Sequence, residues 1–427
     1  MSISRRGFVL GSVGAAGSVL PSRLFAGIGP EAQGSRDVAT SSEQRAQTAT
    51  SLASLGDRFD PWVEVDPAAL RYNVGVLSRL AGGRPIVAVI KNNAYGLGLT
   101  TVTPILETMP EVSGFAVVKT QEALALMAAG TAKPVMLMAL FGDDEGAELV
   151  HQGVHLTLIT DDGPARVLRA QERAGRTARL HAKIDTGMSR MGIPYHRALP
   201  WLERVRASGL SLESTFMGFT EDEEFDREQL RRFGEVAAAA RAAGVGLGRL
   251  HAASSHAVYN FRESHLDQVR PGISLFGAYP TDLGKERDIA VLRPALRLRA
   301  RVVRVERLRA GDSVSYGRHY VADRPTWVAT LPVGHSDGYP REAVKGARVL
   351  VNGALYPVIG SVSASHTILS LGPIVGEESP PVAIGDVATL VGPDVPEIHP
   401  NAVASVTGRS VYDVLMHLSV ALPRVVV

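Results

Sequence analysis

A lysine at the end of an apolar segment is the residue of this sequence with the clearest capacity for chemistry. Residues 85–90 read Pro-Ile-Val-Ala-Val-Ile, which predicts a buried strand, and Lys91 follows directly. If the strand belongs to a parallel barrel, this lysine lies at the mouth where such barrels do chemistry. Burial lowers the pKa of an amine, and the neutral amine can form a Schiff base with a carbonyl compound. Most lysines are simply solvated, so spacing alone leaves both interpretations open.

Two other patterns suggest different chemistry and are set aside. Residues 334–338 read Gly-His-Ser-Asp-Gly, the Gly-x-Ser-x-Gly pattern of a hydrolase nucleophile. That serine needs a helix directly after it, whereas a Tyr-Pro pair follows and the chain alternates like a strand again by Arg348. His251 and His256 lie five residues apart, off one helical face, and no His-Glu-x-x-His motif occurs. We therefore expect neither a serine hydrolase nor a metal site.

The composition excludes several classes of function. The chain of 427 residues has 45 Lys and Arg against 43 Asp and Glu, a net charge of +2, which argues against coating of nucleic acid or an anionic membrane. The absence of cysteine excludes disulfide scaffolds, thiolate metal sites and cysteine nucleophiles. No apolar run of the mature chain is long enough to span a bilayer. A chain of this length is expected to form two domains.

The N-terminus has the features of a targeting segment. Residues 4–8, Ser-Arg-Arg-Gly-Phe, precede a weakly apolar stretch, which resembles a twin-arginine export signal. We expect residues 1–26 to be this signal, with cleavage after Ala26, and the mature protein to be periplasmic or otherwise exported. A membrane anchor is the alternative, but Pro21 ends the apolar stretch short of the length of about 20 residues that a span needs. Residues 27–58 are rich in small and polar residues without apolar periodicity, so we expect a flexible linker.

The remaining chain divides into two patterns. Trp62–Val65 alternates like a strand, and the Asp-Pro pair after it is typical of a helix start. Short apolar runs then alternate with helical patterns to about residue 280, for example 114–118 before 120–129. Repeated strand–helix units predict an α/β domain over 59–290, most simply a (β/α)8 TIM barrel. Beyond it, alternating runs punctuated by Gly and Pro predict a mainly β C-terminal domain over 291–427.

The sequence around Lys91 is similar to a known motif. Residues 88–96, Ala-Val-Ile-Lys-Asn-Asn-Ala-Tyr-Gly, resemble the pyridoxal phosphate (PLP) lysine motif of alanine racemases. The resemblance continues in order across nearly the whole mature chain, through residues 181–190, 251–255, 269–273, 314–317, 332–341 and Tyr412. It implies an N-terminal barrel and a C-terminal β domain, in agreement with the patterns above. Exported broad-spectrum amino-acid racemases are the nearest subfamily in kind.

The resemblance implies PLP-dependent racemisation of a free amino acid, either alanine or a larger one. Lys91 would carry PLP covalently, and the cofactor weakens the bond between Cα and hydrogen. Racemisation removes a proton from one face and returns one on the other, so it needs two acid/base groups, here Lys91 and Tyr316. In the family this tyrosine comes from a second subunit, which implies a homodimer in which Tyr316 enters the partner's site. The ordinary alternative for Tyr316 is a packed strand tyrosine.

Further residues are implied to bind the cofactor and the substrate. Arg270 corresponds to the arginine at the pyridine nitrogen, whose guanidinium does not give up its proton, and the alternative is a surface ion pair. The residues implied to hold the phosphate are Tyr95, Ser255, Tyr412 and the backbone N–H groups of Gly272 and Ile273. Those implied to contact the substrate are Arg190, for its carboxylate, with His335 and Ala364. Lys183 corresponds to a lysine that is often carbamylated, with a plain ion pair to Asp185 as the alternative.

The sequence departs from the family pattern at several positions. A Tyr of the family is His335 here, and a Met-Asp pair is Ala364-Ser365, which removes bulk. We therefore hypothesise a substrate larger or more polar than alanine. Gly218 stands near the position of a family His that supports the catalytic tyrosine, and Ser254 replaces an Asn. Two alternatives stay open: another PLP reaction, such as aldol cleavage, decarboxylation or epimerisation of a modified amino acid, and a non-catalytic protein that binds PLP or amino acids.

Overall fold

The computed structural model describes residues 55–56, 58–281, 283–376 and 379–427. The expected export signal and almost all of the expected linker lie outside these residues. Within them, no helix is both long and apolar enough to cross a membrane. Nor do these residues bring together three or more His, Cys, Asp or Glu side chains that could hold a metal ion.

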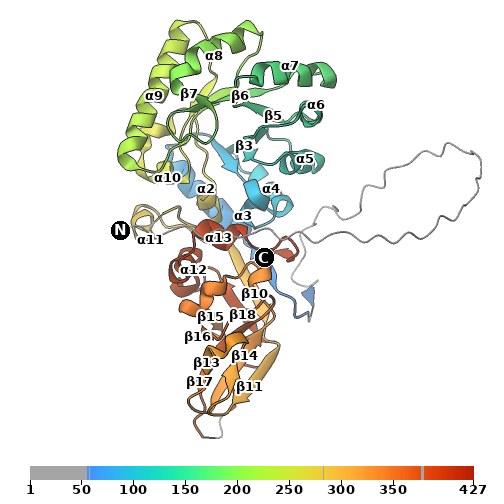
Figure 1. Ribbon diagram of the computed structural model, residues 1–427, viewed down its shortest axis with the longest axis vertical. Helices are drawn as coiled ribbons and strands as arrows, with labels where there is room; N and C mark the ends of the chain where they lie inside the picture. The colour runs from blue at the N-terminus through green and yellow to red at the C-terminus, as the bar shows by residue number, and fades with distance from the viewer. Residues whose placement is uncertain (1–54, 57, 282, 377–378) are drawn as a thin grey trace, which may run out of the picture. The chain divides into compact units, whose positions relative to one another are not determined.

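The first domain is a parallel barrel, as the alternation of strand and helix patterns predicted (Figure 1). Its strands are neighbours in the order of the chain: β2 (Ile86–Val89), β3 (Val112–Val117), β4 (Val135–Leu137), β5 (His155–Leu158), β6 (Leu180–Asp185), β8 (Ser214–Phe216) and β9 (Arg249–His251). The short β7 (Ile193–Pro194) pairs beside β6.

An eighth segment closes the ring between β9 and β2. The N–H of Val87 donates to the carbonyl of Val269 at 2.9 Å, and the N–H of Val269 donates to the carbonyl of Pro85 at 3.0 Å. On the other side, the N–H of Arg270 donates to the carbonyl of Ala253 at 2.8 Å. The fold is therefore a (β/α)8 barrel, and the residues that follow its strands meet at one mouth.

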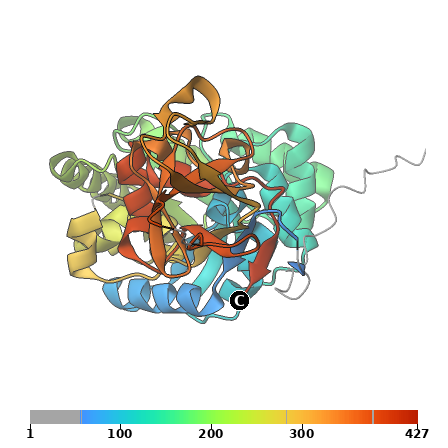
Figure 2. The same ribbon diagram turned by 90° about the horizontal axis from the view of Figure 1, so that it is seen from below.

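Helices cover the outside of the barrel. They are α2 (Pro67–Leu80), α4 (Leu99–Glu107), α5 (Thr120–Ala128), α6 (Asp143–Gln152), α7 (Gly163–Ala174), α8 (Tyr195–Ala207), α9 (Glu223–Ala242), α10 (Ser255–Asn260) and α11 (Leu283–Ile289). Followed by colour from blue to yellow, they lie around the strands in chain order (Figure 2). The predicted start of α2 is present, because the Asp66 carboxylate accepts the N–H groups of Ala68 and Ala69 at 2.8 and 3.0 Å.

The second domain is a mainly antiparallel sheet, as predicted. Its strands lie in the order β11-β14-β17-β16-β15-β18-β10-β1-β19. The bounds are β10 (Leu296–Arg301), β11 (Arg304–Leu308), β14 (Thr326–Leu331), β15 (Arg348–Val351), β16 (Ala354–Ile359), β17 (Thr367–Pro373), β18 (Val387–Val391) and β19 (Arg424–Val426). A separate hairpin joins β12 (Ser313–Val314) to β13 (Tyr320–Val321), and two helices, α12 (Pro400–Thr407) and α13 (Val411–Met416), precede β19.

Strand β1 (Trp62–Val65) corrects the first boundary between the two domains. It lies inside the range 59–290 that we assigned to the barrel, yet it pairs antiparallel with β10 and parallel with β19 of the second sheet. All four of its residues are buried, and both neighbours come from the part of the chain that follows the barrel. The alternation of its residues predicts a strand but carries no information about which distant strands will pair with it. From β1 in the second sheet, the described chain therefore passes through the barrel and then returns to that sheet.

Candidate active site

Lys91 follows β2 at the barrel mouth and begins a left-handed turn, α3 (Lys91–Tyr95). The residues after the lysine, 92–95, have φ angles of 53°, 56°, 52° and 54°. Residues other than glycine are destabilised in this conformation by about 1–2 kcal/mol each, so local sequence alone does not favour the turn. Asparagine tolerates it best, and the Asn-Asn pair at 92–93 is the one sequence signal that could have indicated it.

Contacts with neighbouring elements hold this turn. The N–H of Asn93 donates to Oε1 of Glu122 on α5 at 2.9 Å, and its side-chain oxygen accepts the N–H of Leu99 on α4 at 2.8 Å. Gly96 ends the turn at a φ of 89°, where an added Cβ would lie 2.1 Å from the carbonyl oxygen of Leu415 on α13. Two helices of the barrel and one of the second domain thus fix the backbone from which Lys91 projects.

The amine of Lys91 is held in a partly dry environment. The side chain is half-buried, and its nitrogen lies 6.0 Å from the centre of the Tyr95 ring. Burial lowers the pKa of this amine, the charge of Arg190 lowers it further, and Glu122 opposes both. The neutral amine is the form that attacks an aldehyde, so this environment favours covalent attachment of one.

Lys183 on β6 is a second half-buried amine at the same mouth. Burial lowers its pKa to about 8, and the charges of Arg190 and Arg270 contribute in the same direction. In the described part of the chain no salt bridge joins Lys183 to Asp185. That carboxylate instead accepts two backbone N–H groups of the turn after β6, each at 3.0 Å. The surface ion pair that we kept as the alternative for Lys183 is therefore not formed.

The residues implied to hold a phosphate lie together beside this mouth. The Oγ of Ser255, at the start of α10, accepts the N–H of Gly272 at 2.9 Å and that of Ser274 at 3.4 Å. Gly272 directly precedes a 3-10 turn, η3 (Ile273–Phe276). A buried hydroxyl and a set of backbone N–H groups in such a loop are the donors that a phosphate needs.

Two tyrosines complete this cradle. A Cβ on Gly272 would lie 2.2 Å from the hydroxyl of Tyr95, so only glycine permits this approach. The Tyr95 ring lies with its centre 5.2 Å from that of Phe276 and 6.3 Å from that of Tyr412. Burial raises the pKa of both tyrosines, so both keep their protons and can donate hydrogen bonds. The donor set fits an anion with several oxygens, as a phosphate group is.

Arg270 is buried and bonded to neutral acceptors. Its Nη1 donates to Nδ1 of His251 at 2.7 Å, and its Nη2 donates to the carbonyls of Met217 at 2.7 Å and Ala252 at 3.2 Å. Burial lowers its pKa to about 9, so the guanidinium is still charged at neutral pH. Since its bonds go to neutral groups inside the barrel, the surface ion pair that we kept as its alternative is wrong. The charge remains available to a bound molecule.

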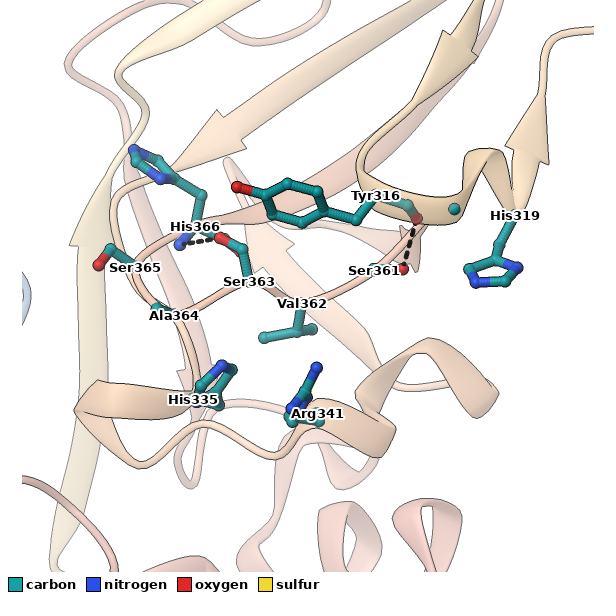
Figure 3. A pocket seen from close by; sticks show the side chains of 11 residues that line it. Tyr316, His319, His335, Arg341, Ser361, Val362, Ser363, Ala364, Ser365 and His366 are labelled. Carbon is teal, nitrogen blue, oxygen red and sulfur yellow. Dashed lines mark hydrogen bonds between the residues drawn. The ribbon is translucent and has the colours of Figure 1, made fainter. Parts of the chain in front are cut away.

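The second-domain residues form a separate pocket of about 570 Å³ (Figure 3). Tyr316, which is 78% exposed, lies in a 3-10 turn, η4 (Tyr316–Arg318), so the packed strand tyrosine is also wrong. His335 and Ala364 line the same pocket. The residues that line it are Tyr316, Gly317, His319, His335, Arg341, Ser361, Val362, Ser363, Ala364, Ser365 and His366, all from the second domain. Within one chain, the residues implied by the resemblance therefore form two groups, one at the barrel mouth and one in the pocket of the second domain.

Two more residues named from the sequence are Arg190 and Ser336. Arg190 is exposed beyond β6 and lines a shallow cavity with Asp185 and Ser189. Ser336 lies in a three-residue turn, η5 (His335–Asp337), and its hydroxyl donates to the carbonyl of Ala364 at 2.6 Å. The next element is another 3-10 turn, η6 (Arg341–Lys345), and not the α-helix that a hydrolase nucleophile would require.

A parallel barrel with an activated lysine and a phosphate cradle at one mouth places this protein among the enzymes that use pyridoxal phosphate. Comparison with known proteins agrees. The family models for the N-terminal and C-terminal domains of alanine racemase match residues 65–280 and 295–426. The chain belongs to the alanine racemase family, which confirms the resemblance drawn from its motifs and, with it, the predicted cofactor.

Individual relatives cover most of both chains. An alanine racemase of Syntrophobacter fumaroxidans is 36% identical over 71% of this chain and 81% of its own. One of Desulforamulus reducens is 33% identical over 73% of this chain and 85% of its own. The solved alanine racemase of Streptomyces coelicolor A3(2) superposes with a TM-score of 0.78 and 29% identity, over 88% of this chain and 99% of that one.

Proposed function

We propose that this racemase uses Lys91 and Tyr316 as its two acid/base groups, and that a second copy of the chain supplies Tyr316. Membership of the family makes the chain a PLP-dependent amino-acid racemase. The observation that carries the proposal is the separation of the two groups. Tyr316 is 78% exposed and lines a pocket without any barrel residue, whereas Lys91 is half-buried at the barrel mouth. A two-fold dimer can bring each tyrosine to the other chain's lysine.

The residues at the barrel mouth have separate tasks in this scheme. The cradle around Ser255 and Gly272 would bind the phosphate, and the neutral amine of Lys91 would bind the aldehyde carbon. PLP supplies electron withdrawal, which weakens the bond between the substrate Cα and its hydrogen. Arg270 would donate a hydrogen bond to the ring nitrogen and keep its proton, which limits that withdrawal. Arg190 would bind the substrate carboxylate.

A mixing experiment tests the shared site. The Lys91→Ala and Tyr316→Phe variants should each be inactive, because each lacks one acid/base group in every site. A hybrid dimer of the two contains one complete site and one doubly defective site. Random exchange of subunits should therefore restore about a quarter of the wild-type rate of racemisation.

The same mixture distinguishes other arrangements. If both groups came from one chain, the mixed variants would stay inactive, and the proposal would be wrong.

Exchange of the substrate Cα hydrogen in deuterated water, followed by NMR and chiral chromatography, tests which reaction the protein catalyses. Racemisation conserves mass, whereas aldol cleavage or decarboxylation releases a fragment, and a binding protein gives no exchange.

We further propose a substrate with a side chain larger and more polar than that of alanine. The pocket that holds Tyr316 is lined by histidines, serines and Arg341, with the small Ala364 among them (Figure 3). Values of kcat/KM over a panel of amino acids test this, and a strict preference for alanine would contradict it. Ala364→Met should lower kcat/KM for large substrates more than for alanine, because it refills the pocket.

We also propose that the protein is exported through its N-terminal segment. Support comes from the Arg5-Arg6 pair ahead of a weakly apolar stretch. Fractionation of cells that express the full chain should find the mature protein in the periplasm. The double substitution Arg5→Lys and Arg6→Lys should retain it in the cytoplasm. Retention of both forms in the cytoplasm would show that the segment is not a signal.

A further inference from the structure

A continuous row of hydrogen-bonded side chains starts at Arg270 and crosses the barrel. Nη1 of Arg270 lies 2.7 Å from Nδ1 of His251, whose Nε2 lies 2.7 Å from Oγ of Ser214. The same oxygen lies 2.6 Å from Nδ1 of His181. Nε2 of His181 then lies 3.2 Å from Nδ1 of His155. Four successive side-chain bonds join residues from four strands and the closing segment.

The guanidinium fixes the direction of the first two bonds in this row, and the proton of Ser214 fixes that of the other two, because among the described residues only Nδ1 of His181 is a further hydrogen-bond partner for that proton. Arg270 has only donors, so Nδ1 of His251 must accept, and a neutral His251 carries its proton on Nε2. That proton goes to Oγ of Ser214, whose own proton is then available for Nδ1 of His181. His181 in turn keeps its proton on Nε2 and donates to His155. The donors all point away from Arg270, and in such a chain each bond strengthens the next.

The row connects the two ends of the barrel. His251 is the last residue of β9, at the mouth that carries Lys91. Ser214 is the first residue of β8, His181 the second of β6 and His155 the first of β5, so these three lie toward the amino-terminal end. His251 and Ser214 are 0% and 1% exposed, whereas His155 is only partly buried and lines a cavity of about 230 Å³ at that end.

We propose that His251, Ser214, His181 and His155 form a one-directional relay that orients Arg270 and makes its contact with the cofactor sensitive to the opposite end of the barrel. The part that concerns the cofactor rests on the proposed place of Arg270 at the ring nitrogen. The four residues are positioning residues, since they act through Arg270.

A proton on His155 conflicts with this relay. A doubly protonated His155 cannot accept the N–H of His181, so His181 would have to carry its proton on Nδ1 and donate to Oγ of Ser214. Oγ of Ser214 would then accept from both histidines, and its own proton would lose its acceptor in the row. A neutral His155 is therefore the form in which every proton of the row has an acceptor, and burial, the largest cause, also lowers the pKa of His155. The charged groups that face it act in opposite directions, because Glu213 raises this pKa, Arg179 lowers it, and the two are themselves paired at 2.7 Å. Arg176 lines the neighbouring cavity.

NMR of the histidine nitrogens tests the relay without any turnover. In protein labelled with 15N-histidine and free of substrate, all three imidazoles should be neutral at pH 7 with the proton on Nε2. In Arg270→Met the direction of the row is no longer imposed, so the pKa of His155 should rise and the single tautomer of His251 should be lost. A proton on Nδ1 of His251 or His181 in the wild type would overturn the proposal. So would an unchanged His155 titration in Arg270→Met.

Two further variants keep the test open if Arg270→Met does not fold. Ser214→Ala removes the middle of the row with little change in volume, and it should also change the His155 titration. Thr215→Val is the matched control, because this adjacent buried hydroxyl donates only to the carbonyl of Leu247, outside the relay. With PLP bound, Ser214→Ala should lower kcat about ten-fold with little change in KM, and Thr215→Val should leave kcat unchanged. If the two substitutions changed kcat and the His155 titration equally, the row would have only a structural role, and the proposal would be overturned.

The two proposals can fail separately. Absence of Cα-hydrogen exchange in deuterated water with every amino acid would contradict the function, while the histidine tautomers of the substrate-free protein would be unaffected. Wrong tautomers in an active racemase would contradict the relay alone.

Discussion

The hydroxyl of Tyr95 occupies the space that a side chain at position 272 would need, since a Cβ on Gly272 would lie 2.2 Å from it. Gly272→Ala should therefore push Tyr95 out of the phosphate cradle. Overpacking of this kind costs about 1–3 kcal/mol, which corresponds to a roughly 5- to 150-fold weaker affinity for PLP. Titration of the apoprotein with PLP, followed by absorbance, measures the change. Gly246→Ala, with nothing within 4 Å of its added Cβ, is the control that should bind normally.

Glu122 supports the reactive turn and also sets the charge around it. It accepts the N–H of Asn93 at 2.9 Å, and its charge raises the pKa of Lys91 against the lowering by burial and Arg190. Glu122→Gln keeps an acceptor but removes that charge, so the pKa of Lys91 should fall further. Because only the neutral amine reacts, the rate of covalent PLP attachment rises with pH through this pKa. The rise should move to lower pH in Glu122→Gln, and a move to higher pH would contradict the assignment.

Lys183 should form a carbamate with dissolved CO2. Its pKa of about 8 leaves a substantial neutral fraction near neutral pH, and the charges of Arg190 and Arg270 beside it would favour the negative product. Carbon NMR in 13C-bicarbonate should show a carbamate signal that grows as the pH rises from 7 to 9. Lys183→Arg should lack the signal, because a guanidinium does not react. A signal that persists in Lys183→Arg would place the carbamate elsewhere.

Arg424 ties the last strand to the loop behind the reactive lysine. Its guanidinium donates to the carbonyl of Gly96 at 2.7 and 3.1 Å, and to those of Ser419 and Leu422 at 2.7 and 2.6 Å. Arg424→Ala leaves these carbonyls without donors and should lower the free energy of unfolding by about 3 kcal/mol. Urea denaturation followed by circular dichroism measures it. Arg324→Ala, which breaks an exposed pair with Asp323, should cost at most about 1 kcal/mol.

Local pattern was enough to predict the strand before Lys91, the capped start of α2 and the change from barrel to sheet. Each of these is decided by residues close in sequence, through apolar periodicity, caps and turn residues. The motifs then indicated the family and the residues implied to bind the cofactor. For Tyr95, Ser255, Gly272 and Tyr412, the structure brings together what the resemblance grouped.

Tertiary structure decided the rest. The left-handed turn at 92–95 opposes local preference and exists because Glu122 and two helices hold it. The sheet that includes β1 depends on strands that follow the whole barrel in the chain. The partners of Arg270 lie on β9 and in the segments after β8 and β9, and no short window of sequence contains them. Sequence periodicity records how each residue relates to its neighbours along the chain, whereas burial and hydrogen bonding across the barrel depend on which distant segments meet.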